Sequence, residues 1–314
     1  MDPIMWLALA VLVVLYTLQS LLTKLYTDKY PGSEDVASSV LTFVSGTFVV
    51  IVTFFFFAKM EFTVNLWSII IGVVNAAALY FYNFFIVKSS QTGPYSIIMM
   101  FSLSGGIIIP IIASLIMGWD NAWSTPFKCI VNVISITSII LAVYLASKKD
   151  GVEEKKVTLA FILSCLGLGV SNGVYGIMLT LQQQVEAAGG EGNRDEMIIT
   201  TFLFAAIISL VTGVAKQGGG FFKSVVKQNK LSLLYLIGTS IVFALALNVI
   251  VIIIPFFDTT ILYTLDNSSV LIMSVLCSCI FFKEKLSSKN VVGISVMVSA
   301  LVAMNLLPAV FPNL

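Results

Sequence analysis

The stretch TTILYTLDNSSVLIMSVLCSCIFFKEKLSSKNVVG, residues 259–293, is apolar enough to lie in a bilayer, yet it carries four polar residues in a row, Asp266 to Ser269. Its charged residues come much later, at Lys283-Glu284-Lys285. An ionisable side chain in hydrocarbon costs about 2.5–3.5 kcal/mol on insertion scales, so a carboxyl at that depth needs a partner, a cavity or a function. The stretch therefore predicts a membrane helix with a polar site inside it.

The composition of the whole chain agrees with this interpretation. Of 314 residues, 58% are hydrophobic and 11% are charged, whereas a soluble domain is about half apolar and a quarter charged. The net charge of +1 gives no electrostatic reason to expect a nucleic-acid partner. Four cysteines in apolar segments and no histidine predict neither a disulfide, a metal site nor a cofactor.

The chain offers ten apolar runs of about the 20 residues that a bilayer-spanning helix needs. We expect an all-α membrane protein with ten spans near 4–24, 37–58, 66–88, 93–117, 126–147, 157–182, 197–215, 231–255, 259–282 and 288–310. The connections are short and hide no soluble domain.

Basic residues are distributed unequally between the two sides that this arrangement defines. Of the 17 lysines and arginines, 14 fall in alternate connections on one side, and only Lys59, Lys128 and Arg194 fall on the other. The excess of positive charge on cytoplasmic loops predicts that the lysine-rich connections, including 148–156, are cytoplasmic. Both termini are then extracytoplasmic, in a multi-pass protein of a cell membrane such as a bacterial inner membrane.

The two halves of the chain, 1–150 and 151–314, resemble copies of each other. An offset of roughly 163 residues sets Ser104-Gly105-Gly106 against Asn267-Ser268-Ser269. A similar offset brings Asn83 to Asn248. Because each half has five helices, the second copy must enter the membrane from the opposite side. Such an inverted repeat is typical of secondary transporters, whose substrate site lies at the midplane between the repeats. A chance match of two apolar segments is the alternative.

Asp266 is the one acid that we place well inside a span. An intramembrane acid usually marks a substrate or ion path. The alternative is a structural carboxyl that is held protonated or is capped by Ser268 and Ser269.

Other polar residues in the spans complete the predicted substrate site. Ser104 and Gly105, followed by Pro110, predict a break in the fourth span, although tight helix packing would explain them too. Tyr16 with Gln19, and Asn172 with Tyr175, are pairs three residues apart that share a helix face. The predicted substrate-binding residues are Asp266, Asn267, Ser269, Ser104, Gly105, Tyr16, Gln19, Tyr82, Asn83, Asn172, Tyr175, Asn248 and Tyr263.

Motifs of membrane-embedded catalysis are missing from the sequence. It has no histidine, no G-x-S-x-G, no H-E-x-x-H and no intramembrane acid pair, so we do not expect an enzyme. The only arginine is expected in a loop, and no lysine is expected near mid-membrane. Nothing therefore predicts a charged contact with a phosphate or carboxylate.

Ten spans in two repeats, together with CIFFKEKLSSKNVVGISVMVSALVAMNLL at 279–307, resemble the drug/metabolite transporter (DMT) superfamily, specifically its EamA-like family. The second repeat of that family often ends in a glycine-glutamate-basic-leucine turn and a helix with an early glycine. Here the turn is Lys283-Glu284-Lys285-Leu286 and the glycine is Gly293, with phenylalanine in place of the turn's glycine. The resemblance implies a secondary transporter that works by alternating access.

We expect the substrate to be a small neutral, zwitterionic or cationic metabolite, such as an amino acid, an amine or a drug-like compound. One buried acid, several tyrosines and no buried base favour that class. A lipid flippase or passive channel is the alternative function, and a structural or receptor-like protein is a third. The expected partners are the substrate, the lipid bilayer and protons as a coupling ion. We expect a monomer, with a dimer as the alternative.

Overall fold

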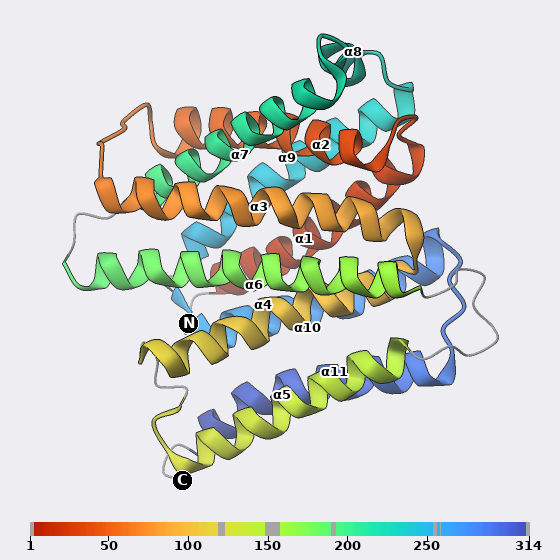
Figure 1. Cartoon of the computed structure of the whole chain (residues 1–314). Helices are drawn as coiled ribbons and strands as arrows, with labels where there is room; N and C mark the ends of the chain where they lie inside the picture. The colour runs from red at the N-terminus through yellow and green to blue at the C-terminus, as the bar shows by residue number, and fades with distance from the viewer. Residues whose placement is uncertain are drawn as a thin grey trace.

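The computed structural model describes residues 3–118, 123–147, 158–189, 193–253, 256–257 and 259–311, and within these ranges it contains helices and turns but no strand (Figure 1). The helices are α1 (Pro3–Lys29), α2 (Glu34–Val52), the π-helical turn η1 (Thr53–Phe57), α3 (Leu66–Thr92), α4 (Tyr95–Met117), α5 (Pro126–Ser147), α6 (Leu159–Ala187), α7 (Arg194–Gln217), α8 (Gly220–Val226), α9 (Lys230–Ile253), α10 (Thr259–Phe281) and α11 (Ser288–Val310).

Nine helices in the described part of the chain are long and apolar enough to cross a bilayer. Their bounds follow the predicted runs closely, as in α3, which begins at the predicted Leu66 and ends at Thr92. The described apolar stretch of α10, Leu265–Phe281, is shorter than the nine. The chain is thus a multi-pass, all-α membrane protein, and the tenth span stays a prediction.

Consecutive long helices run in opposite directions, which gives the molecule two distinct ends (Figure 1). The N- and C-termini both lie toward the left of the picture, whereas α8 and the α10–α11 turn lie toward the right. We call the latter the lysine-rich end, because its described residues include Lys24, Lys29, Lys88, Lys216, Lys223, Lys227, Lys230, Lys283, Lys285 and Lys289. The connection 148–156 lies outside the described residues.

The helices pack in pairs that join the two halves of the chain. The helix α5 pairs with α11, α1 with α9, and α6 with both α3 and α4. The helix α7 packs against α2 and α3. In Figure 1 the α5–α11 pair forms one margin of the molecule and α7 lies near the other. The helices α1, α3, α4, α6, α9 and α10 each pack against at least two other helices.

Glycines allow α4 and α6 to approach closely. A Cβ at Gly105 would lie 2.1 Å from the carbonyl oxygen of Gly169, closer than any side chain tolerates. The helix α4 is continuous through Pro110, so the predicted break is wrong. The carbonyl of Gly106, which Pro110 cannot bond, faces α6 beside Gly176. The close packing of α4 on α6 thus covers the free carbonyl of Gly106, and α4 stays helical there.

Side-chain caps set where several helices begin. Asn65 accepts a hydrogen bond from the Ser68 amide at the start of α3, and Thr158 accepts one from the Phe161 amide at the start of α6. Ser287 does the same for Asn290 in α11. Such side chains satisfy amides that have no partner inside the helix.

Candidate binding cavity

A cavity of about 150 Å³ lies between six helices, α1, α3, α4, α6, α9 and α10. Each helix contributes residues spaced three or four apart, such as Met99 with Ser102 and Leu103 on α4, and so presents one face to the cavity. The volume is about ten times what one water molecule needs, so a small organic molecule fits. Seven of the predicted site residues line it: Tyr16, Gln19, Tyr82, Asn172, Tyr175, Asp266 and Asn267.

Asp266 lines the cavity from α10 and is 6% exposed. Its buried Oδ1 has no hydrogen-bond partner among the described residues, and neither has the Oγ of Ser268. A purely structural carboxyl would be capped by a neighbouring serine. Ser268 does not provide this cap at Oδ1. An acceptor left unpaired in a buried wall costs about 1–3 kcal/mol, so Oδ1 is a favourable position for a cation or a donor from a bound molecule.

Aromatic and amide side chains form much of the remaining wall. Tyr16, Tyr82, Tyr175 and Phe243 surround the cavity from four different helices. Asn172 donates from Nδ2 to the carbonyl oxygen of Ser102 at 2.8 Å, which ties α6 to α4 at the cavity. Phenol and phenyl rings suit the apolar body of a ligand or the face-on contact of an ammonium group.

Five predicted site residues lie outside the cavity. Ser104 bonds the carbonyl of Met100 and faces the sulfur of Met297, while Gly105 lies against the backbone of α6. Asn248 donates to the Ala244 carbonyl and to Thr53 Oγ1, away from the cavity. The buried Asn83 and the half-buried Ser269 complete this group. A helix turns by about 100° per residue, so neighbours of a lining residue can face another helix instead.

Tyr263 belongs to α10, but its side chain lies outside the described residues. Several lining residues were missed by sequence reasoning, among them Ser20, Met99, Ser102, Leu103, Gly106, Gly176 and Phe243. Two of these carried a signal. Ser20 follows Gln19 directly, and Gly106 belongs to the glycine pair of α4. The apolar members look like any other core residue in the sequence.

A smaller pocket of about 20 Å³ adjoins the cavity and shares Tyr16 and Tyr175 with it. Gln183 and Arg194 also line this pocket, at the end opposite the lysine-rich one. Arg194 is not in a loop as predicted, because it begins α7, and it pairs with Glu186 at 2.8 Å. Space lined mainly by apolar side chains therefore continues from the cavity toward that end.

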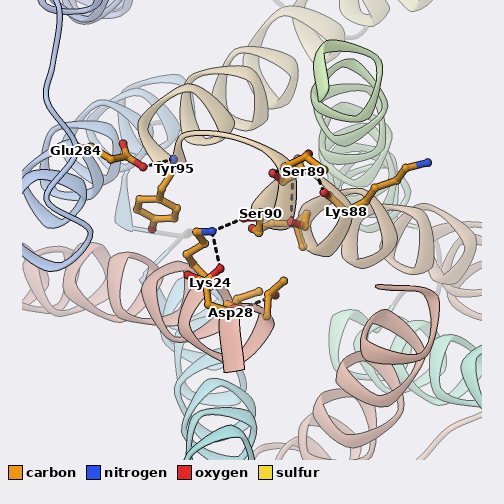
Figure 2. A network of polar contacts seen from close by, with 11 residues as sticks. Lys24, Asp28, Lys88, Ser89, Ser90, Tyr95 and Glu284 are labelled. Carbon is orange, nitrogen blue, oxygen red and sulfur yellow. Dashed lines mark hydrogen bonds and ion pairs between the residues drawn. The ribbon is translucent and has the colours of Figure 1, made fainter. Parts of the chain in front are cut away.

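At the lysine-rich end, a network of polar contacts joins α1, α3, α4 and the α10–α11 turn (Figure 2). Lys24 is only 2% exposed and belongs to α1, which corrects its predicted place in a connection. Its Nζ donates to Asp28 Oδ1 at 2.8 Å and to the carbonyl of Ser90. One turn nearer the cavity, Ser20 and Tyr95 share a hydrogen bond of 2.6 Å between their hydroxyls. The left-handed residue of the α10–α11 turn is Lys283, with φ of 53°.

Comparison with known proteins defines the fold and no more. No family model matches the chain, and no curated protein matches it. A solved structure titled "Crystal structure of protein" superposes with a TM-score of 0.55 over 97% of this chain and 99% of its own, at 12% sequence identity. The chain is thus similar in fold, over nearly its whole length, to a protein whose title states no activity.

Proposed function

We propose that the chain is a secondary transporter that moves a small neutral, zwitterionic or cationic metabolite by alternating access. The observation that carries the proposal is Asp266, a buried carboxylate whose Oδ1 has no partner among the described residues and which lines a central cavity. Buried acids in membrane proteins mark substrate or ion paths, and the described residues that line the main cavity include no basic side chain, whereas Arg194 of the adjoining pocket is paired with Glu186. A cationic or neutral donor group suits this site better than a phosphate or carboxylate.

The finer architecture of this proposal is ten spans in two inverted five-helix repeats. Exchange of α1 to α5 with α6, α7, α9, α10 and α11, in that order, maps the contact of α1 with α9 onto that of α6 with α3. It also maps α3 with α7 onto α9 with α2, and α4 with α6 onto α10 with α1. The pairs α5–α11, α2–α7 and α4–α10 map onto themselves. This exchange pattern supports the repeat and a cavity between its copies.

Membership of the EamA-like DMT family is part of the proposal, and it rests on the Lys283-Glu284-Lys285-Leu286 turn before α11. The orientation rests on lysine: the lysine-rich end would face the cytoplasm and both termini the outside. Catalysis is not proposed, because the cavity gathers one acid, tyrosines and amides without a nucleophile–base pair.

Counterflow in liposomes tests the function. Purified protein is first screened by thermal shift against amino acids, amines, sugars and nucleosides. Compounds that raise the melting temperature are then loaded into proteoliposomes, and uptake of the labelled compound is followed. A transporter gives saturable uptake that is accelerated by unlabelled compound on the far side. Uptake without saturation or counterflow would indicate a passive channel, and lipid scrambling without either would indicate a flippase.

A further inference from the structure

Three polar contacts join helices at the lysine-rich end of the cavity, beside apolar side chains such as Phe282 and Leu286. The first is made by Lys24, whose ammonium bonds the Ser90 carbonyl at the end of α3 and Asp28 on α1 (Figure 2). The same ammonium lies 5.8 Å from the centroid of the Phe282 ring in the α10–α11 turn. A buried lysine is stable only when its donors are used. Lys24 thus joins α1 to α3 and to that turn.

The second contact lies directly beneath the cavity. Ser20 lines the cavity, and its hydroxyl bonds that of Tyr95, the first residue of α4, which is 1% exposed. The Tyr95 ring packs on Phe282 with 5.4 Å between centroids. Lys24 and Tyr95 therefore both touch the same phenylalanine, and separation of α1 from α4 would break the bond at the cavity floor.

The third contact joins the α10–α11 turn to the start of α4. The residue that precedes α4 is Pro94, which has no side chain able to cap the helix. Glu284 takes this role from elsewhere in the sequence, because its carboxylate accepts from the amides of Tyr95 and Ser96 and from Ser96 Oγ at 2.9 Å (Figure 2). A carboxylate at a helix N-terminus also interacts favourably with the helix dipole.

These contacts suit a closure that opens and shuts. Each internal hydrogen bond replaces bonds that the same groups would make to water, so it contributes only about 0.5–1.5 kcal/mol net, and about 1.5–3 when one partner is charged. Their loss is therefore compatible with two states that differ by a few kcal/mol. The helix α10 carries Asp266 in the cavity and leads directly into the turn that holds Phe282 and Glu284, so a movement of α10 would affect the cavity and the closure together.

We propose that these contacts are the gate that closes the binding cavity at the lysine-rich end, and that their release admits water and solute from that side. We call this set the lysine-end gate; it comprises Ser20, Lys24, Ser90, Tyr95, Phe282 and Glu284. The inference rests on the proposed transport function, but its test does not need a substrate.

The test measures how fast a cysteine in the cavity reacts with a membrane-impermeant thiol reagent from each side of the membrane. The reporter is Val270→Cys, a nearly isosteric change on the cavity wall, in a chain whose native cysteines are replaced: Cys129, Cys165, Cys277 and Cys279. An exposed site at the lysine-rich end, Lys227→Cys, is labelled in parallel to identify which side that end faces.

Two variants weaken the gate and one serves as their control. Tyr95→Phe removes only the hydroxyl that bonds Ser20, and Lys24→Met removes the ammonium while it keeps most of the side-chain volume. Lys88→Met is the matched control, since Lys88 lies at the same end of α3 with its ammonium over Phe84, outside the gate (Figure 2). Size-exclusion chromatography reports whether each variant is folded, and Tyr95→Phe is conservative enough to keep the test decisive if Lys24→Met is not.

The expected result is one-sided. From the lysine-rich side, labelling of Val270→Cys speeds up about 2–12-fold in Tyr95→Phe and about 10-fold or more in Lys24→Met, with no change in Lys88→Met. From the opposite side the rate falls in the same two gate variants, because the population shifts away from the state open there. Unchanged rates, or a rise from both sides through general loosening, would overturn the proposal. If counterflow is observed but the labelling rates do not change, the transport function is supported and the gate is refuted. If labelling changes on one side but no counterflow is observed, the gate is supported and the transport function is refuted.

Discussion

Asp266→Asn separates a binding carboxylate from a structural one, because the two roles predict opposite effects on affinity and stability. The variant keeps the shape of the side chain and removes its charge. At a distance of about 4 Å and an effective dielectric constant of about 20, a cation is attracted to a carboxylate by about 4 kcal/mol. Loss of water from the cation offsets part of this, which leaves about 1.5–3 kcal/mol, as for other hydrogen bonds to charged groups. Affinity for a cationic substrate should therefore fall about 10–150-fold.

The stability of the ligand-free protein should change in the other direction. Asp266 is 6% exposed and its Oδ1 lacks a partner among the described residues, so the wild-type protein buries a poorly compensated carboxyl group. The melting temperature of ligand-free Asp266→Asn should be no lower than that of the wild type, and a gain of about 1 kcal/mol would raise it by about 1–2 °C.

The assay is thermal unfolding in detergent with and without the amine or amino acid that stabilises the wild type most, followed by counterflow. Ser269→Ala is the matched control, because Ser269 lies on the same helix but outside the cavity. The control should leave melting temperature, affinity and transport as they are. Full affinity and transport in Asp266→Asn, together with a lower melting temperature, would refute the reasoning and make Asp266 a structural carboxyl.

Three further predictions concern packing, backbone strain and topology. Gly105→Ala places a methyl group 2.1 Å from the Gly169 carbonyl oxygen, so it should destabilise the protein by about 1–3 kcal/mol or more in thermal unfolding. Gly219→Ala is the control, because no atom lies within 4 Å of the added methyl group. Equal melting temperatures of the two variants would contradict the close approach of α4 and α6. Lys283→Gly should stabilise the α10–α11 turn by up to about 1–2 kcal/mol, since φ of 53° costs a lysine more than a glycine, and a lower melting temperature would show that the lysine side chain matters more than the backbone. In a chain without native cysteines, Lys227→Cys should react with an impermeant thiol reagent only after the cytoplasmic face is exposed, and Glu61→Cys should react on intact cells; the reverse pattern would invert the proposed orientation.

The sequence by itself determined the class of protein and the bounds of its long helices. A bilayer span requires about 20 apolar residues, and that requirement is local, so runs such as 66–88 and 288–310 predict α3 and α11 within a few residues. The position of Asp266 along α10 also follows from its place in the run, because each helical residue advances about 1.5 Å. These features depend on neighbours in the chain alone.

Only the tertiary structure decided which polar residues meet. Asn172 bonds the backbone of Ser102 across two helices, while Asn83, equally polar and equally central in its run, does not line the cavity. When a helix has apolar residues on all sides, its sequence does not determine how the helix is rotated about its own axis. In lipid the outer face is as apolar as the core, so hydrophobic periodicity does not distinguish them.

The polar contacts at the lysine-rich end of the cavity were even less predictable from the sequence. Lys24 and Glu284 have the sequence context of ordinary lysine-rich connections, but folding buries one between α1 and α3 and places the other on the N-terminus of α4. A helix preceded by proline lacks a local cap, and the group that replaces it comes from 189 residues away. Glu284 can cap α4, and Lys24 can bond the Ser90 carbonyl, only after the packing of the helices brings these groups together.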